Sequence, residues 1–159
     1  MSGNGLVDSR IEEASEEDLT EILQLQKKAF EAVAIKENNF DIQPLKQTYE
    51  EIVLEFKKRK FLKYILNGSI IGSVRGHVDE NNICYVGKLI VHPDFQNAGI
   101  GTALMKELEK YFSTCSSFEI FTSQNSENTL FLYKKLGYTE MYVKEVDNVS
   151  IVFMKRENK

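Results

Sequence analysis

Apolar residues recur at the spacing of an amphipathic helix in four stretches of the chain. The first stretch, over 16–35, follows Ser15, which suits an N-cap, and its first turn is acidic, as the helix dipole favours. A second helix is predicted over 44–56, because proline in a first turn costs no hydrogen bond. The last two helices are predicted over 99–112 and 127–136.

Between these helices, short apolar or alternating runs bounded by turn residues predict strands. Asn67-Gly68 is typical of a hairpin turn, and the run over 83–91 is apolar at most positions, as expected of a central strand. Two helices come first, then a meander, a strand–loop–helix unit and a hairpin, so the order predicts a mixed α+β domain. The predicted strands are 61–66, 69–78, 83–91, 118–122, 138–146 and 149–154.

Length and composition narrow the class of protein. The 159 residues suit one domain over 1–159, in which residues 1–9 are expected to form a flexible N-terminus. With 42% hydrophobic and 28% charged residues, the chain is not typical of a disordered protein. The net charge of -4 argues against a general nucleic-acid binder. The polar start and the absence of a long apolar run predict a cytoplasmic protein that does not bind membranes.

Cysteines and histidines do not form a metal-binding pattern. Cys84 and Cys115 belong to no CxxC motif, and His77 and His92 are far apart, so no metal site is predicted. Both cysteines are interpreted as small buried apolar groups in a reducing compartment. A cysteine nucleophile paired with one of the histidines stays open as the less favoured alternative.

The segment over 91–102 carries the most chemical information, because a buried strand runs through a short loop into glycines that begin a helix. Free backbone N–H groups at such a helix start bind phosphate oxygens. A Walker A loop is excluded because no lysine follows Gly101, and a dinucleotide fingerprint is excluded because Leu104 stands where a third glycine is needed. Basic residues outnumber acidic ones over 51–110, which also favours an anionic ligand in this region. Much of this excess comes from Lys57-Lys58-Arg59-Lys60, a run that we interpret as a solvated helix end.

Three motifs carry a resemblance to a known family. They are the Gly87–Pro93 strand end, the Gln96–Gly101 loop and the Leu132–Tyr138 segment that ends in Tyr-x-x-x-Gly-Tyr. In this order and separation, the chain resembles the GNAT-type N-acetyltransferases over nearly its whole length. The resemblance implies an acyl-CoA N-acyltransferase fold, whose central mixed, mostly antiparallel sheet is flanked by about four helices.

The same resemblance implies that acetyl-CoA is the cosubstrate. Its pyrophosphate would lie on the backbone amides of the glycine-containing loop, and its pantetheine would pair with the central strand as another strand would. Asn128 is a further candidate for the pantetheine, although many relatives place an asparagine where this chain has Ser126. The candidates are Leu89, Ile90, Val91, Gln96, Asn97, Ala98, Gly99, Ile100, Gly101, Thr102 and Asn128.

Tyr133 matches the residue that protonates the departing CoA thiolate in many relatives, and a phenol is a suitable proton donor. The alternative is that Tyr133 is a core aromatic residue of its helix.

The general base is not identified, because Lys88 stands where many relatives have glutamate, and lysine serves as a base only when desolvation lowers its pKa. The other candidates are His77, Asp79, Glu80 and Glu119, or a chain of water molecules.

The favoured interpretation is an N-acetyltransferase in which a primary amine of a small molecule or peptide directly attacks acetyl-CoA in a ternary complex. The alternatives are a non-catalytic acyl-CoA-binding regulatory module and a nucleotide-binding module. The acidic first third is suited to a cationic acceptor, or it forms the solvated face of the first helix. Acceptor contacts are expected over 31–43, and a homodimer through the C-terminal strands is an open possibility.

Overall fold

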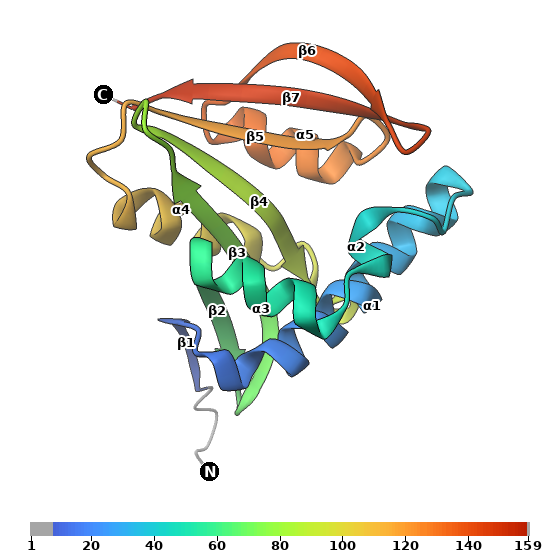
Figure 1. Ribbon diagram of the computed structural model, residues 1–159, viewed down its shortest axis with the longest axis vertical. Coiled ribbons are helices and arrows are strands. Elements are labelled where there is room, and N and C mark those ends of the chain that lie inside the picture. Colours follow the sequence, from blue (N-terminus) through green and yellow to red (C-terminus); the bar gives the residue numbers. More distant parts are fainter. Residues whose placement is uncertain (1–7, 159) are drawn as a thin grey trace.

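The computed structural model describes residues 8–158, whose seven strands form one sheet in the order β1-β2-β3-β4-β5-β7-β6 (Figure 1). Only β4 and β5 are parallel, and every other neighbouring pair is antiparallel, which confirms the predicted mixed, mostly antiparallel sheet. The strands are β1 (Ser9–Glu13), β2 (Lys60–Leu66), β3 (Ser69–Val78), β4 (Ile83–Val91), β5 (Ser117–Ser123), β6 (Thr139–Val146) and β7 (Val149–Glu157).

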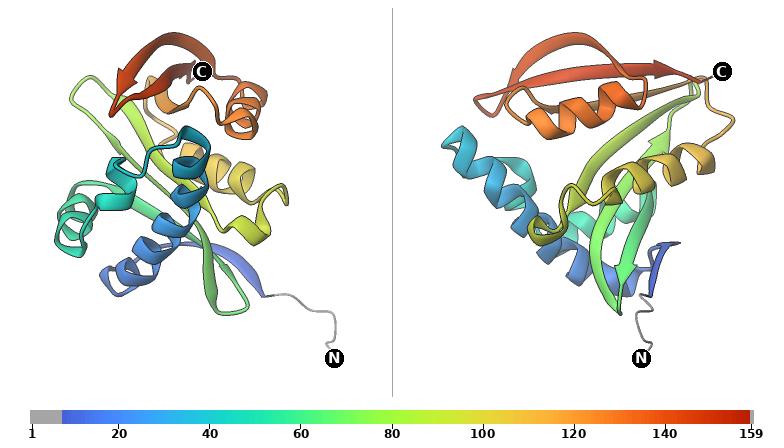
Figure 2. Two further views of the ribbon diagram at one scale, coloured as in Figure 1. Left: turned by 90° about the vertical axis from the view of Figure 1, so that its right-hand side faces the viewer. Right: turned by 180° about the vertical axis from the view of Figure 1, so that it is seen from behind.

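Helices cover both faces of this sheet. The helices are α1 (Leu19–Glu37), α2 (Gln43–Lys46), α3 (Tyr49–Lys58), α4 (Ile100–Tyr111) and α5 (Glu127–Lys135), with 3-10 turns η1 (Glu16–Asp18) and η2 (Pro93–Phe95). Figure 2 shows α1 and α3 on one side of the strands and α4 and α5 on the other. The three layers bury the apolar stripe of each amphipathic helix against the sheet.

Two apolar clusters lie on opposite faces of the sheet. On the face of α1 and α3, Leu19 and Ile52 pack with Phe61, and all three are almost fully buried. On the opposite face, residues of α4 such as Leu104 pack with residues of the central strands such as Phe118. Because each face of the sheet is covered, the central strands read as nearly continuous apolar runs, as the sequence indicated for β4.

Most predicted elements are found within a few residues of their expected bounds, but the helix predicted over 44–56 is divided. It forms α2 and α3, which are separated at Gln47 and Thr48. Thr48 Oγ1 accepts a hydrogen bond from the backbone N–H of Glu51 at 3.2 Å, and the Glu51 carboxylate accepts one from the N–H of Thr48 at 2.9 Å. This capping box begins a new helix, and its Thr-x-x-Glu signal is visible in the sequence.

The structure tests only part of the expectation that residues 1–9 form a flexible N-terminus. Residues 1–7 of the segment predicted to be flexible lie outside the described residues, whereas Ser9 already belongs to β1. The register pairs β1 with β2 from Ser9 opposite Leu66 to Glu13 opposite Leu62. The strand therefore begins two residues before Ile11, where the sequence pattern showed only a short apolar segment.

The contact between α4 and β3 depends on Gly72, and it yields a first prediction. A Cβ atom at Gly72 would lie 2.9 Å from Ile100 Cγ2 and 3.0 Å from Leu104 Cδ1, closer than packed carbon atoms allow. We expect Gly72→Val to destabilise the fold by about 1–3 kcal/mol, because overpacking forces α4 away from the sheet. Urea unfolding measures this loss, and Gly72→Ala should show a smaller one. An unchanged unfolding midpoint for the valine variant would contradict the tight contact.

Candidate active site

A cavity lies where β4 and β5 diverge. The two strands pair only from Ile83 opposite Ser117 to Tyr85 opposite Glu119. Figure 1 shows them meeting near the C-terminus and separating toward α1. The remainder of β4 therefore has a strand neighbour on its β3 side only, and a cavity of about 480 Å³ opens beside it.

A bulge in β4 accompanies this divergence. Ser73 pairs with Ile90 and Arg75 pairs with Gly87, so two residues of β4, Lys88 and Leu89, lie opposite one residue of β3. Lys88 has a φ of 47°, which is uncommon for a residue with a Cβ atom. An extra residue of this kind bends a strand and disrupts its ladder. The pattern of apolar residues did not reveal the bulge, because the residues before and after it, Gly87 and Ile90, both belong to β4.

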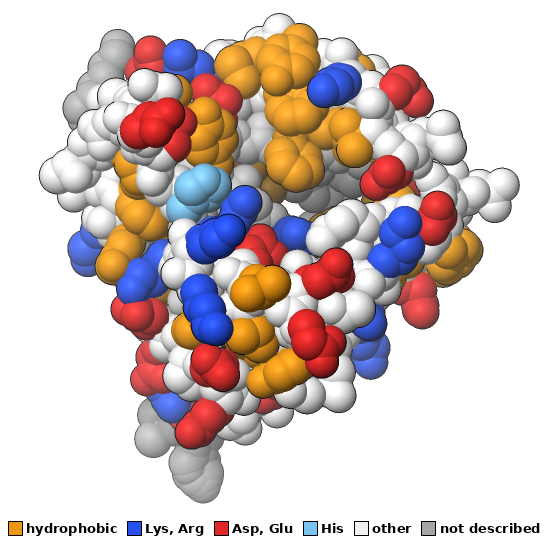
Figure 3. Space-filling view, in the orientation of Figure 1, with side chains coloured by type: hydrophobic (Ala, Val, Ile, Leu, Met, Phe, Trp, Pro, Cys, Tyr) orange, Lys and Arg blue, Asp and Glu red, His pale blue; other side chains and the backbone are white. Residues whose placement is uncertain are grey.

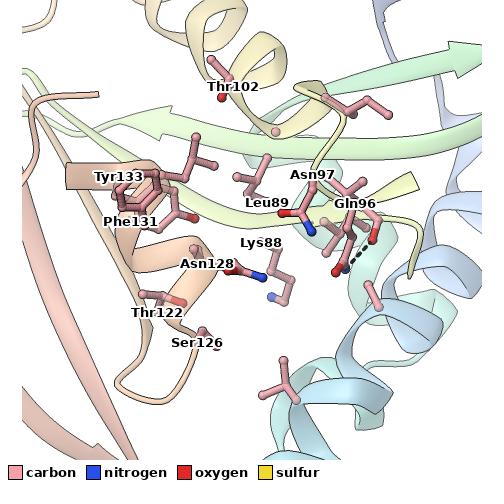
Figure 4. A pocket seen from close by; sticks show the side chains of 18 of the residues that line it. Lys88, Leu89, Gln96, Asn97, Thr102, Thr122, Ser126, Asn128, Phe131 and Tyr133 are labelled. Atoms are coloured by element: carbon pink, nitrogen blue, oxygen red, sulfur yellow. Dashed lines mark hydrogen bonds between the residues drawn. The ribbon is translucent and has the colours of Figure 1, made fainter. Parts of the chain in front are cut away.

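The N-terminus of α4 forms one wall of the cavity. Gly99 precedes the helix with a φ of 83°, a conformation that glycine adopts without strain. The Gln96 side chain donates from Nε2 to the Val91 carbonyl at 3.3 Å, which holds the loop against the end of β4 (Figure 4). The free N–H groups and the positive dipole end of α4 therefore lie beside the cavity.

Nearly all the predicted cosubstrate-binding residues come together around this cavity. Those that line it are Leu89, Ile90, Val91, Gln96, Asn97, Gly99, Ile100, Gly101, Thr102 and Asn128. Ala98 is the one predicted binding residue that does not line it. Ser126, the position at which the resemblance implies an asparagine in many relatives, lines it as well.

Tyr133 lines the cavity from α5, and its side chain is almost fully buried (Figure 4). Burial raises the pKa of Tyr133 above its ordinary value, so the phenol keeps its proton at neutral pH. Within residues 8–158 its hydroxyl has no hydrogen-bond partner, whereas the neighbouring Tyr138 donates to Glu109 at 2.9 Å. Tyr133 is thus a buried core aromatic residue that keeps its proton, and its role as the acid stays a prediction.

The end of α1 closes the open side between β4 and β5. The Glu37 carboxylate accepts hydrogen bonds from Ser123 Oγ at 2.6 Å and from Asn125 Nδ2 at 2.9 Å. These bonds tie α1 to the end of β5 and to the loop that leads into α5. Within the range where acceptor contacts were expected, Val33 lines the cavity, and Phe30 does so just before it.

Lys88 projects from the bulge into the cavity, away from Thr102 of α4 (Figure 4). Its Nζ lies 3.8 Å from Oε1 of Glu55, a residue of α3 whose side chain is mostly buried. Burial lowers the pKa of Lys88 to about 8. The negative charge of Glu55 raises this pKa and offsets only part of the effect of burial, and the positive charges of Arg75 and Arg59 lower it further. Desolvation of this lysine is the condition under which it could accept a proton.

Glu55 is the centre of a buried polar network that sequence reasoning missed. Arg75 Nη1 donates to Glu55 Oε1 at 2.8 Å, and Gln47 Nε2 donates to the same oxygen at 2.9 Å. Burial alone would raise the pKa of Glu55, but Arg75, Lys88 and Arg59 outweigh it and hold that pKa below its ordinary value. The carboxylate stays ionised and is a poor proton acceptor. One signal was present in the sequence, since Arg75 is a charged residue within an apolar strand.

The other proposed bases and the cysteines lie away from the cavity. His77, Asp79, Glu80 and Glu119 are absent from its lining. Cys84 and Cys115 are both buried, as predicted, and burial raises the pKa of Cys84 to about 12, so its thiol stays protonated.

Over residues 8–158 the structure contains no group of three or more His, Cys, Asp or Glu side chains placed to hold a metal ion. No helix in that range combines the length and the apolar character needed to span a membrane.

Comparison with known proteins assigns this arrangement to a family. The model of the Acetyltransferase (GNAT) family matches residues 11–138, which include β4, β5 and all of the helices α1 to α5. The chain belongs to the GNAT family. A curated acetyltransferase of Pectobacterium atrosepticum is 35% identical over 82 residues, which are 49% of this chain and 56% of that protein. In this match the chain spans little more than half the length of its relative.

Solved GNAT structures share the fold at low sequence identity. The PaiA N-acetyltransferase of Thermoplasma acidophilum, in complex with coenzyme A, is 16% identical with a TM-score of 0.78, covering 94% of this chain and 99% of that one. The phosphinothricin acetyltransferase of Sinorhizobium meliloti, in complex with acetyl-CoA, is 17% identical with a TM-score of 0.76, covering 94% and 88%. These likenesses extend the GNAT architecture to nearly the full chain.

The buried charge of Lys88 yields a prediction for the stability of the fold. The fold lowers the pKa of Lys88 from 10.5 to about 8, so the unfolded chain holds this proton more tightly, and wild-type stability rises with pH across that interval. At pH 7, Lys88→Gln should therefore raise the unfolding free energy by about 1–2 kcal/mol, or roughly 3–6 °C in Tm.

Thermal melts of the two proteins at pH 7 and pH 9.5 measure this difference, which should shrink at the higher pH, where wild-type Lys88 is neutral. Lys57→Gln is the control, because Lys57 is exposed on the same helix as Glu55. A lower Tm for Lys88→Gln than for wild type at pH 7 would contradict the burial argument.

Proposed function

We propose that the protein is an N-acetyltransferase that moves the acetyl group of acetyl-CoA to an amine. The observation that carries the proposal is the cavity between β4 and β5, which has a free strand edge on one side and the N-terminus of α4 on another. Membership of the GNAT family supports acetyl transfer as the chemistry. The solved relatives in complex with coenzyme A or acetyl-CoA support the choice of cosubstrate.

Main-chain groups fit the two polar parts of acetyl-CoA. The N–H groups from Gln96 to Thr102 would bind the pyrophosphate, because they are free at a helix start and the dipole favours anions. The edge of β4 over Leu89, Ile90 and Val91 has no neighbour from β5, so it would pair with the pantetheine amides as a strand would. Such contacts are independent of side-chain identity, which suits a cosubstrate held by main-chain atoms.

In the proposed reaction, the neutral amine attacks the thioester carbonyl directly in a ternary complex. Backbone N–H groups near Ile90 and Val91 would stabilise the tetrahedral oxyanion, and Tyr133 would donate its proton to the departing thiolate. The phenol is suited to this step because burial keeps it protonated and nothing in the described structure occupies its hydroxyl. The proton released by the amine would pass to water, and the Tyr133 phenolate would regain a proton from water once CoA has left as the thiol.

Thiol release from acetyl-CoA over a panel of primary amines tests the function. Wild type should release CoA with at least one amine, and Tyr133→Phe should lower kcat by about 100-fold, the low end of general-acid effects. Tyr111→Phe is a matched control, because Tyr111 is exposed on α4 and lies outside the cavity.

Each other result points to a different role. Equal kcat for wild type and Tyr133→Phe would exclude Tyr133 as the acid. Tight acetyl-CoA binding without turnover of any amine would instead support the non-catalytic acyl-CoA-binding regulatory module. ATP or NAD competing as well as CoA would support a nucleotide-binding module, and we expect both to compete poorly.

A further inference from the structure

Three cationic side chains share a single carboxylate beside the cavity. Glu55 lies within 4.0 Å of the charged atoms of Arg75, Arg59 and Lys88, at 2.8, 3.4 and 3.8 Å. Over residues 8–158, Glu55 is the one ion-pair partner that these three cations have. The cluster therefore carries an excess of two positive charges when Lys88 is protonated.

Only two of these cations are available to a ligand. Arg75 is fully buried, donates from Nη2 to Gln26 at 2.7 Å, and lies over the Phe61 ring at 4.3 Å. By contrast, the Lys88 and Arg59 side chains retain 17% and 31% of their exposure. Arg75 thus completes the interior of the network, whereas the other two reach the surface.

Lys88 and Arg59 lie close to each other beside β4, because both approach the Glu55 carboxylate. A Cβ atom at Gly87 would lie 3.4 Å from Arg59 Nη1, so the guanidinium lies over the strand one residue before Lys88. Arg59 is just outside the residues that line the cavity, and Lys88 is among them. Figure 3 shows charged side chains along the lower edge of a hollow on this face, with hydrophobic side chains along its upper edge.

An aromatic cluster of β5, β6 and β7 reaches the cavity through Phe121. Phe121 lines the cavity, although about half of its surface is exposed, and its ring lies 5.5 Å from that of Phe153. The Tyr142 ring stacks on the Phe153 ring, and the two ring centres lie 4.8 Å apart. An acceptor placed here would meet the Lys88 side chain and the apolar surface of Phe121, which both line the cavity.

Three acidic residues of the first third, Glu13, Asp18 and Glu37, pair elsewhere and not with Lys88 or Arg59. Glu13 pairs with Lys60, and Asp18 pairs with Lys63 at 2.7 Å, both on the β1–β2 side of the sheet. Glu37 is held by Ser123 and Asn125. The sequence interpretation that these acids attract a cationic acceptor therefore has no support from their contacts.

We propose that the acceptor carries an anionic group, a carboxylate or a phosphate, close to its amine, and that Lys88 and Arg59 bind this group. The proposal rests on the proposed function and specifies its substrate class. A part-buried excess of positive charge is costly to maintain, and a bound anion would remove that cost. Charge-assisted hydrogen bonds to two cations would also orient the amine toward the thioester.

Matched pairs of acceptors test the proposal. Amino acids are compared with their amides, which keep the amine and replace the carboxylate by a neutral group, and phosphoethanolamine is compared with ethanolamine. For at least one pair, we expect the anionic member to have a kcat/KM about 10-fold higher or more, and the pair that shows it identifies the anion. Equal use of both members in every pair would overturn the proposal.

Variants show whether Lys88 binds an anion or transfers a proton. Lys88→Gln and Arg59→Gln should raise KM for the anionic acceptor by about 10-fold or more and leave that for its neutral partner nearly unchanged. Lys88→Arg keeps the charge and should keep the preference, and Lys57→Gln, with the same loss of charge on exposed α3 surface, should resemble wild type. A collapse of kcat for both acceptors in Lys88→Arg would overturn the proposal in favour of a proton-transfer role.

Direct binding separates this proposal from the proposed function. If no amine is turned over, the function fails, and calorimetric titration of the same pairs into the CoA-saturated protein then tests the anion site. Tighter binding of the anionic member to wild type than to Lys88→Gln would support the site, and equal binding would overturn it. Turnover without any preference for anions would leave the function standing and exclude the anion site.

Discussion

The divergence of β4 from β5 is the constraint on which the rest of the site depends. Parallel pairing between them stops after three residue pairs, and the bulge at Lys88 bends β4 away from a straight ladder. A strand in the middle of a sheet is thereby left with an unpaired edge beside a cavity. Because buried backbone groups require partners, an edge of this kind is suited to a ligand that offers amides of its own.

The two faces of the sheet contribute different parts of the site. On one face, α4 and α5 bring main-chain N–H groups and Tyr133 to the cavity. On the other, α1 and α3 supply Glu37, which closes the open end, and Glu55, which organises the buried cations. Residues of α1, α4 and α5 line the cavity together. The direct transfer that we propose would take place within this shared lining.

Local patterns predicted most of the fold, and most of the residues that they singled out for cosubstrate binding line the cavity. Apolar periodicity located the long helices and strands, because each buries one face or both faces in the same way along its length. The glycines before α4 indicated an anion site, because their effect depends on a few adjacent residues. The division of the second helix was missed although the capping signal from Thr48 to Glu51 was present, since proline at position 44 was taken as the start of one continuous helix.

The sequence by itself determined the fold class, the family resemblance and the candidate residues of the glycine loop, because these depend on spacing along the chain. Only the tertiary structure decided how far Lys88 is buried, how far its pKa is lowered and which charged residues surround it. Glu55, Arg59 and Arg75 come from α3, the residue after it and β3, and no local pattern links them to position 88. Charge and burial at that position depend on the packing of these segments, and packing is not encoded by nearest neighbours.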